Sequence, residues 1–146
     1  MSDDPTTAGK PLPLPLMEGH SKQFYDWCRQ HELRFQRCTG CGTWRHVPRE
    51  MCAACGSFEW EWARSNGRGR VFTWTVIARA MHPAFQDRVP YAPVVIEMDE
   101  GVRILSEIVD CAPYELAIGM PVEVIFVAVT PEVTLPKFQR YRTTGK

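Results

Sequence analysis

The apolar residues near the start of the chain recur at the spacing of a helix. The stretch KQFYDWCRQHEL, residues 22–33, follows Ser21, a candidate N-cap, and predicts an amphipathic helix. We expect this aromatic stripe to pack against the rest of the chain or against another subunit, with Cys28 as a small buried residue. The apolar positions of the stripe are Phe24, Trp27, Cys28 and Leu33.

From residue 59 onward the apolar positions follow the period of a β-strand. Trp60 and Trp62 alternate with glutamates, and Asn66-Gly67 is a turn signal. Residues 70–80 predict a long strand that is buried on both faces for part of its length. The remaining predictions are a hairpin of residues 94–98 and 102–109, a short helix over 112–118 that ends at Gly119, and strands over 121–129 and 135–142.

About five strands of this length cannot cover both of their faces as an open sheet. Closing the sheet into a small barrel removes its exposed edges. The sequence therefore predicts a mainly β protein whose strands form a five-stranded barrel of the oligonucleotide/oligosaccharide-binding type, the OB-fold.

Four of the six cysteines lie between the helix and the strands, in CTGCGTWRHVPREMCAACG. Cys38 and Cys41 form one pair, Cys52 and Cys55 form the other, and a glycine follows each pair. Two residues between cysteines let both sulfurs face one small ion, and glycine can take the positive φ that aims backbone amides at thiolates. Four sulfurs suit a tetrahedral Zn²⁺, so the spacing predicts a structural zinc site.

Other uses of these cysteines fit less well. A thioredoxin-like redox site has one pair at the start of a helix, and a catalytic zinc needs an open coordination position. Iron held as in rubredoxin also fits four sulfurs, so the sequence leaves zinc and iron open. The cationic residues in or beside the cluster either offset its charge or are simply solvated; they are Arg37, Arg45, His46 and Arg49.

Composition narrows the classes of function. The chain has 146 residues, of which 45% are hydrophobic, and 17 basic residues balance 17 acidic ones. A neutral chain has no bulk attraction for nucleic acid or anionic lipid. No apolar run reaches the length of about 18–20 residues that crosses a membrane, and the acidic, proline-broken start is no signal peptide. We therefore expect a cytoplasmic protein with reduced thiols, no membrane association and no nucleic-acid partner.

The sequence shows no catalytic set. None of His20, His31, His46 and His82 lies in a nucleophile motif, and Cys111 has no base beside it in sequence. The irregular stretch 78–91 mixes cationic and apolar side chains, which suits a CoA ester, a protein partner or a loop that caps the barrel. Its candidate contact residues are Arg79, His82, Phe85, Arg88 and Tyr91. We expect that the chain is not an enzyme by itself.

These patterns divide the chain into four parts. They are a disordered tail over 1–17, a helical segment over 18–35, a zinc ribbon over 36–62 and an OB-fold barrel over 63–141.

Several motifs in this order resemble the DUF35 family. They are the cysteine cluster, GRGRVFTWTVI, VPYAPVVIEMDEGVRILSEIVD and IGMPVEVIF, and the resemblance covers about residues 18–130. The family consists of an N-terminal helix, a rubredoxin-like zinc ribbon and an OB-fold. The resemblance implies that Cys38, Cys41, Cys52 and Cys55 bind zinc, although many relatives have a proline after the first cysteine of the second pair.

The resemblance also implies a partner. DUF35 proteins typically accompany thiolase-fold enzymes, in acyl-CoA condensation or cleavage that includes retro-aldol removal of steroid side chains, and some accompany MaoC-like enoyl-CoA hydratases. We therefore expect a non-catalytic accessory subunit in a hetero-oligomer with a thiolase-fold enzyme. The alternatives are a partner of a MaoC-like hydratase, a rubredoxin-like electron carrier, or a single-stranded nucleic-acid-binding module in which Phe72 and Trp74 stack on bases.

Overall fold

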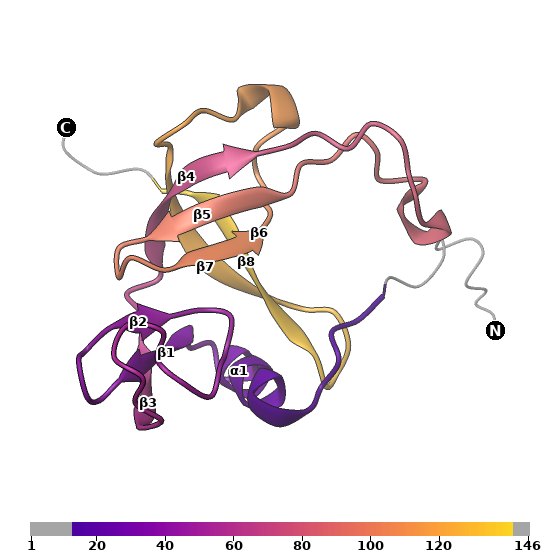
Figure 1. Cartoon of the computed structure of the whole chain (residues 1–146). Helices are drawn as coiled ribbons and strands as arrows, with labels where there is room; N and C mark the ends of the chain where they lie inside the picture. Colours follow the sequence, from indigo (N-terminus) through magenta and orange to yellow (C-terminus); the bar gives the residue numbers. More distant parts are fainter. Residues whose placement is uncertain (1–12, 142–146) are drawn as a thin grey trace.

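The computed structural model describes residues 13–141 and contains one long helix and two β-sheets (Figure 1). The predicted mainly β class, with an N-terminal helix before the strands, is confirmed. The elements are α1 (Gly19–Arg29), β1 (Arg34–Cys38), β2 (Trp44–Arg45), β3 (Trp60–Arg64), β4 (Arg68–Trp74), β5 (Val94–Met98), β6 (Arg103–Ser106), β7 (Pro121–Ala128) and β8 (Thr134–Arg140), with single 3-10 turns at Pro83–Phe85 and Pro113–Glu115.

The first sheet is small and antiparallel, in the order β2-β1-β3. Its central strand β1 buries Phe35 completely, and β3 carries the predicted alternation of Trp60 and Trp62. Neither β1 nor β2 was predicted: the buried polar Gln36 interrupts the apolar pattern of β1, and β2 has only two residues. The helix ends at Arg29, and His31 then takes a positive φ of 61° that turns the chain toward β1.

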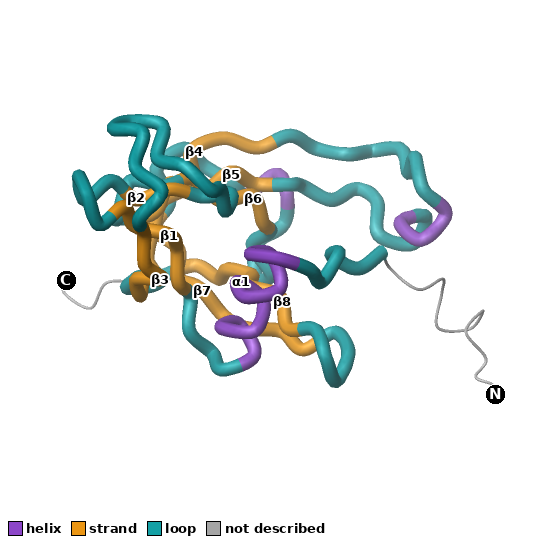
Figure 2. The backbone as a smooth tube through the Cα atoms, turned by 60° about the horizontal axis from the view of Figure 1, so that its bottom comes forward, coloured by secondary structure: helices purple, strands orange, loops and turns teal. Residues whose placement is uncertain are grey.

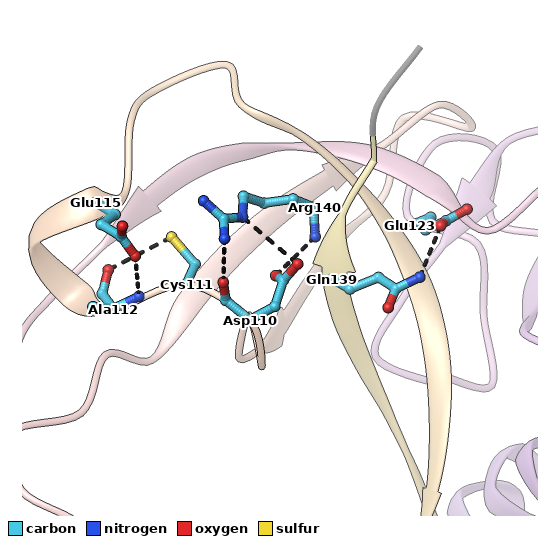
Figure 3. Close-up of polar contacts among 7 residues, drawn as sticks. All are labelled: Asp110, Cys111, Ala112, Glu115, Glu123, Gln139 and Arg140. Atoms are coloured by element: carbon cyan, nitrogen blue, oxygen red, sulfur yellow. Dashed lines mark hydrogen bonds and ion pairs between the residues drawn. The ribbon is translucent and has the colours of Figure 1, made fainter. Parts of the chain in front are cut away.

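The second sheet is antiparallel and curled, in the order β6-β5-β4-β7-β8. The segment that follows the edge strand β6 meets the other edge strand, β8, through a parallel bridge between Ile108 and Phe138, where the Val109 amide donates to the Phe138 carbonyl at 2.8 Å. Arg140 and Asp110 extend this contact through backbone and side-chain bonds (Figure 3). The predicted five-stranded barrel is confirmed in the form of a curled five-stranded sheet, a half-barrel, and the bridge removes part of its exposed edges.

One apolar core joins the helix, the small sheet and the curled sheet. Phe24 and Cys28 of α1 lie in the same buried cluster as Phe35 of β1 and Phe138 of β8. The helix contacts β8 directly, and Figure 2 shows it lying against that strand. Each fully buried large apolar side chain contributes about 1.5–3 kcal/mol, so this shared core holds the two sheets together.

Several boundaries differ from the sequence prediction. The helix has Glu18 rather than Ser21 as its N-cap. The strand predicted over residues 70–80 ends at Trp74, and Phe72 is 40% exposed because the outer face of β4 meets solvent rather than a second layer. The predicted helix over 112–118 is a single 3-10 turn that begins at Pro113. The predicted hairpin of β5 and β6 and the last two strands, β7 and β8, are confirmed.

The predicted disordered tail falls mostly on residues 1–12, which lie outside the described residues; residues 13–17 form no regular element. The four-part division of the chain remains a prediction. Within residues 13–141, no helix has the length and apolar character needed to cross a membrane.

We predict that Gly69 cannot accept a side chain. A Cβ here would lie 2.6 Å from the Glu97 carbonyl oxygen of the neighbouring strand, which is backbone and cannot move aside. Gly69→Ala is expected to lower the free energy of unfolding by about 3 kcal/mol, measured by urea denaturation. Gly101→Ala is the control, because its Cβ meets no atom within 4 Å and only its φ of 95° is strained. Equal losses in the two variants would contradict this account.

We predict that His46 makes stability depend on pH. Its ring packs 4.9 Å from that of Phe24 and 5.1 Å from that of Phe35, and burial lowers its pKa to about 4. Since the unfolded chain binds a proton here near pH 6.5 and the folded chain does not, the stability is complete above about pH 6.5 and falls toward about pH 4. Urea midpoints between about pH 7 and about pH 5 should fall less in His46→Gln than in the wild type. Equal slopes would refute the assignment.

Candidate functional site

The first cysteine pair lies in a tight turn after β1. The Cys38 amide donates to the Thr43 carbonyl at 2.8 Å, and the Gly42 amide donates to the Cys38 carbonyl at 2.9 Å. Gly42 has a φ of 79°, which residues with a Cβ rarely adopt. The Gly40 amide donates to the Cys38 Sγ at 3.3 Å, so the turn aims a backbone donor at the sulfur.

The second pair repeats this geometry. The Cys52 amide donates to the Ser57 carbonyl and the Gly56 amide donates to the Cys52 carbonyl, both at 2.8 Å. Gly56 has a φ of 82°. The two turns therefore present their sulfurs in the same way, as the repeated Cys-x-x-Cys-Gly pattern predicts.

The four sulfurs meet in one cluster. The Sγ atoms of Cys38 and Cys55 lie 3.6 Å apart, those of Cys41 and Cys52 lie 3.7 Å apart, and all four lie within 4.8 Å of one another. None of the four is in a disulfide. Tetrahedral Zn²⁺ with Zn–S distances of about 2.3 Å needs sulfurs about 3.8 Å apart. The cluster is therefore suited to a structural zinc ion.

The pKa values of three of the cysteines are shifted by their neighbours in the cluster. The Cys41 amide lowers the pKa of Cys38, and the Thr43 hydroxyl lowers the pKa of Cys41 to about 6. The Ser57 amide acts to lower the pKa of Cys55, but the neighbouring Cys38 and Cys41 sulfurs raise it to about 11. A cation bound among the sulfurs favours the thiolate form, which is the form that binds metal.

The cationic residues near the cluster have separate roles. The Arg37 guanidinium donates to the Gly42 carbonyl at 3.3 Å and so lies at the first turn. Arg45 instead donates to the Gln36 side chain at 2.8 Å, and His46 packs between aromatic rings. Arg37 therefore lies beside the first turn of the cluster, where its charge can offset that of the thiolates.

The stretch 78–91 follows β4 in a loop that reaches away from both sheets (Figure 1). The rings of Phe85 and Tyr91 stack with their centroids 5.3 Å apart, and Arg88 lies at the same groove. Arg79 and His82 are exposed and do not line it. The His82 Nδ1 accepts the Ala84 amide at 3.0 Å and so caps the 3-10 turn. The structure thus brings three of the five candidate contact residues together.

That groove has a volume of about 640 Å³ and lies between α1, the loop and the edge strands β6 and β8. Sequence reasoning missed its other wall, which includes Tyr25, Leu105 and Lys137. These residues come from distant parts of the chain, and no local pattern connects them.

Cys111 lies in an adjoining cavity of about 210 Å³, which shares Tyr91 with the groove and is also lined by Leu116. Burial raises its pKa, and its thiol donates to the Ala112 carbonyl at 3.5 Å (Figure 3). A thiol held in this way is a poor nucleophile, because the thiolate is the reactive form.

We predict that the cysteine cluster binds about one zinc ion per chain. Cys52→Ser should lose the metal and destabilise the small sheet by several kcal/mol, since metal binding and folding are coupled. Cys111→Ser, outside the cluster, should keep the metal. Elemental analysis and thermal denaturation with and without chelator measure both effects. Iron and a red colour in the pure protein would contradict zinc, and equal zinc in both variants would contradict the ligand set.

Known proteins resemble the chain over most of its length. A structure titled "Ltp2-ChsH2(DUF35) aldolase" superposes with a TM-score of 0.78 at 35% identity, covering 87% of this chain and 98% of that one. A probable enoyl-CoA hydratase alpha subunit of Thermomonospora curvata is 36% identical over 127 residues, 87% of this chain. The chain spans 39% of the length of that relative.

Three matches show the family to which the chain belongs. The model described as the ChsH2 rubredoxin-like zinc ribbon domain matches residues 28–61, and that of the ChsH2 C-terminal OB-fold domain matches residues 62–127. A DUF35 domain-containing scaffold protein of Methanothermobacter thermautotrophicus is 32% identical over 105 residues, 71% of this chain and 78% of the relative. With its zinc ribbon, curled five-stranded sheet and N-terminal helix, the chain belongs to the DUF35 family.

Proposed function

We propose that this chain is a non-catalytic accessory subunit of an acyl-CoA-processing complex and that its partner is a thiolase-fold enzyme. The observation that carries the proposal is its match to 98% of the DUF35 chain in an aldolase that also contains a second component, Ltp2. We infer the fold of the partner from the family, because DUF35 proteins typically accompany thiolase-fold enzymes. The partner contributes the catalytic groups, and cleavage of a steroid side-chain CoA ester is one reaction of this class.

The chemistry of the chain fits a supporting role. Four cysteines leave no open position on a tetrahedral zinc, so the metal has no site for a substrate. Burial raises the pKa of the Cys111 thiol, which donates to the Ala112 carbonyl. The thiolate is the reactive form of cysteine, so a raised pKa does not favour Cys111 as a nucleophile.

A MaoC-like enoyl-CoA hydratase is the second candidate partner. It is favoured by the likeness to a protein named as the alpha subunit of a probable enoyl-CoA hydratase. Because this chain spans 39% of that relative, a hydratase would come from another chain or from the rest of a longer protein.

Binding of single-stranded nucleic acid has less support. The Arg103 guanidinium lies 3.8 Å from the Phe72 ring centroid, and Trp74 packs against the core. A stacking platform needs open ring faces and a basic groove, whereas the chain has equal numbers of acidic and basic residues.

We predict that the chain alone has no turnover on CoA esters and that it forms a stable complex with a thiolase-fold protein. A pull-down from the native cell with the tagged, metal-loaded full chain, followed by mass spectrometry, identifies the partner. The isolated partner should then be less soluble, or slower by about tenfold or more, than the complex. The Cys52→Ser variant, which lacks the metal, serves as the control that tests whether the complex needs an intact zinc ribbon.

Two results would count against this proposal. Capture of a MaoC-like hydratase in place of a thiolase-fold protein would support the alternative partner. Identical partner activity and solubility with and without the chain would remove the accessory role itself.

A further inference from the structure

Aromatic rings line the groove between α1, the loop and the edge strands. Two rings belong to α1 and two to the loop, and the rings of the loop stack with their centroids 5.3 Å apart. These residues are Phe24, Tyr25, Phe85 and Tyr91. Grooves with aromatic walls are the sites at which several kinds of recognition domain bind proline-rich segments.

The chain has a proline-rich segment that touches this groove. Residues 11–16 read PLPLPL and precede α1. Pro13 and Pro15 line the groove, whereas Leu14 is 49% exposed and Leu16 is 71% exposed, and neither leucine lines it. The alternation therefore places the prolines on the groove and leaves the leucines open to solvent.

Proline suits a segment that docks on apolar walls. Its ring fixes φ near about −65° and keeps the preceding residue extended, so little conformational freedom is lost when the segment docks. Proline also has no amide hydrogen that would need an acceptor in the groove. Pro11 is the next proline in the same alternation, so the pattern that lies on the groove at Pro13 and Pro15 extends beyond the described residues.

The groove and the start of the chain carry opposite charges. Arg88 lines the groove and has no carboxylate within 4.0 Å among residues 13–141. Residues 1–10 contain two acids, Asp3 and Asp4, and one base, Lys10. At about 3.1 Å per residue, an extended chain from Pro13 back to Asp4 spans about 28 Å, so the acids can reach Arg88 along the groove.

We propose that the groove is a docking site for residues 1–12 of the same chain. These residues continue the course of Pro13 and Pro15 along the aromatic rings, and their two acids lie at Arg88. The segment is thus a strap over the open side of the curled sheet between β6 and β8. Because a short tether keeps it at an effective concentration on the order of 1 mM, any other occupant has to displace it.

Solution NMR of the isotope-labelled, zinc-loaded full chain tests the strap directly. Nuclear Overhauser contacts are expected between the ring of Pro11 and the rings of Phe85 or Tyr91. Backbone order parameters of residues 6–10 and of Leu12 should exceed about 0.6, the value below which a backbone counts as flexible.

Two phenylalanines give a matched pair of variants. Phe85 lines the groove, whereas Phe58 of the zinc ribbon is 66% exposed and does not line it. Phe85→Ala should lower the order parameters of residues 6–12 below about 0.6, and Phe58→Ala should leave them unchanged. Arg88→Glu carries the test if circular dichroism shows that Phe85→Ala is unfolded.

A charge exchange tests the acidic end of the strap. Arg88→Glu should lower the order parameters, because it places like charges together. Adding Asp3→Lys and Asp4→Lys to Arg88→Glu should restore them, which a purely structural role of Arg88 would not do. Both effects should shrink in about 1 M salt, where the Debye length is about 3 Å.

Each other occupant of the groove gives a distinct result that overturns the strap. Missing contacts between Pro11 and the groove rings, or wild-type order parameters below about 0.6, leave the segment undocked. Contacts found only between differently labelled copies assign the groove to the segment of a second copy. A groove that is protected from hydrogen exchange only in the complex is a contact for the partner enzyme. Since the strap is measured on the isolated chain, failure of the accessory role leaves it standing.

Discussion

The packing of α1 between the two sheets is the contact on which the rest of the structure depends. Phe24 and Cys28 enter the same buried cluster as Phe35 of the small sheet and Phe138 of the curled sheet. A sheet of three short strands has too little apolar surface to form an independent core, because small folds bury a small fraction of their surface. The metal centre stabilises it at one end and the shared core at the other. Neither sheet is therefore independent of the helix.

This arrangement links the metal centre to the groove through a short stretch of backbone. Strand β1 runs from Phe35 in the core to Cys38 in the cluster. Between them the side-chain Oε1 of Gln36 accepts the Arg45 guanidinium at 2.8 Å and the Arg49 amide at 2.7 Å, which fixes the segment that joins the two cysteine pairs. His46, within that segment, packs on Phe24 and lines the groove. A metal ion in the cluster thus supports one wall of the groove through contiguous hydrogen bonds and packing.

The features that could be predicted from the sequence are those that residues close together in the chain determine. Spacing alone brings Cys38 and Cys41 onto one turn, and the Asp-Glu-Gly turn between two apolar runs marks the hairpin of β5 and β6. The strand β1 was missed because the buried Gln36 interrupts its apolar pattern. The predicted two-sided burial of β4 was wrong because its outer face meets solvent, where only the Arg103 guanidinium lies over the half-exposed Phe72 ring. The groove was predicted only along its loop, since its other residues are distant in sequence.

The long connection between β4 and β5 forms a fixed wall because its two arms are hydrogen-bonded to each other. The Ile77 amide donates to the Tyr91 carbonyl at 2.7 Å and the Tyr91 amide donates back at 3.1 Å, while the Thr75 amide donates to the Pro93 carbonyl at 3.2 Å. Connections of this length in compact domains usually carry function, and this one brings Phe85 to the groove on a paired stem. Because the two arms are paired through backbone hydrogen bonds, the loop is fixed in place by the fold itself. The apolar side chains of Phe85 and Tyr91 are therefore held in a defined position at the groove.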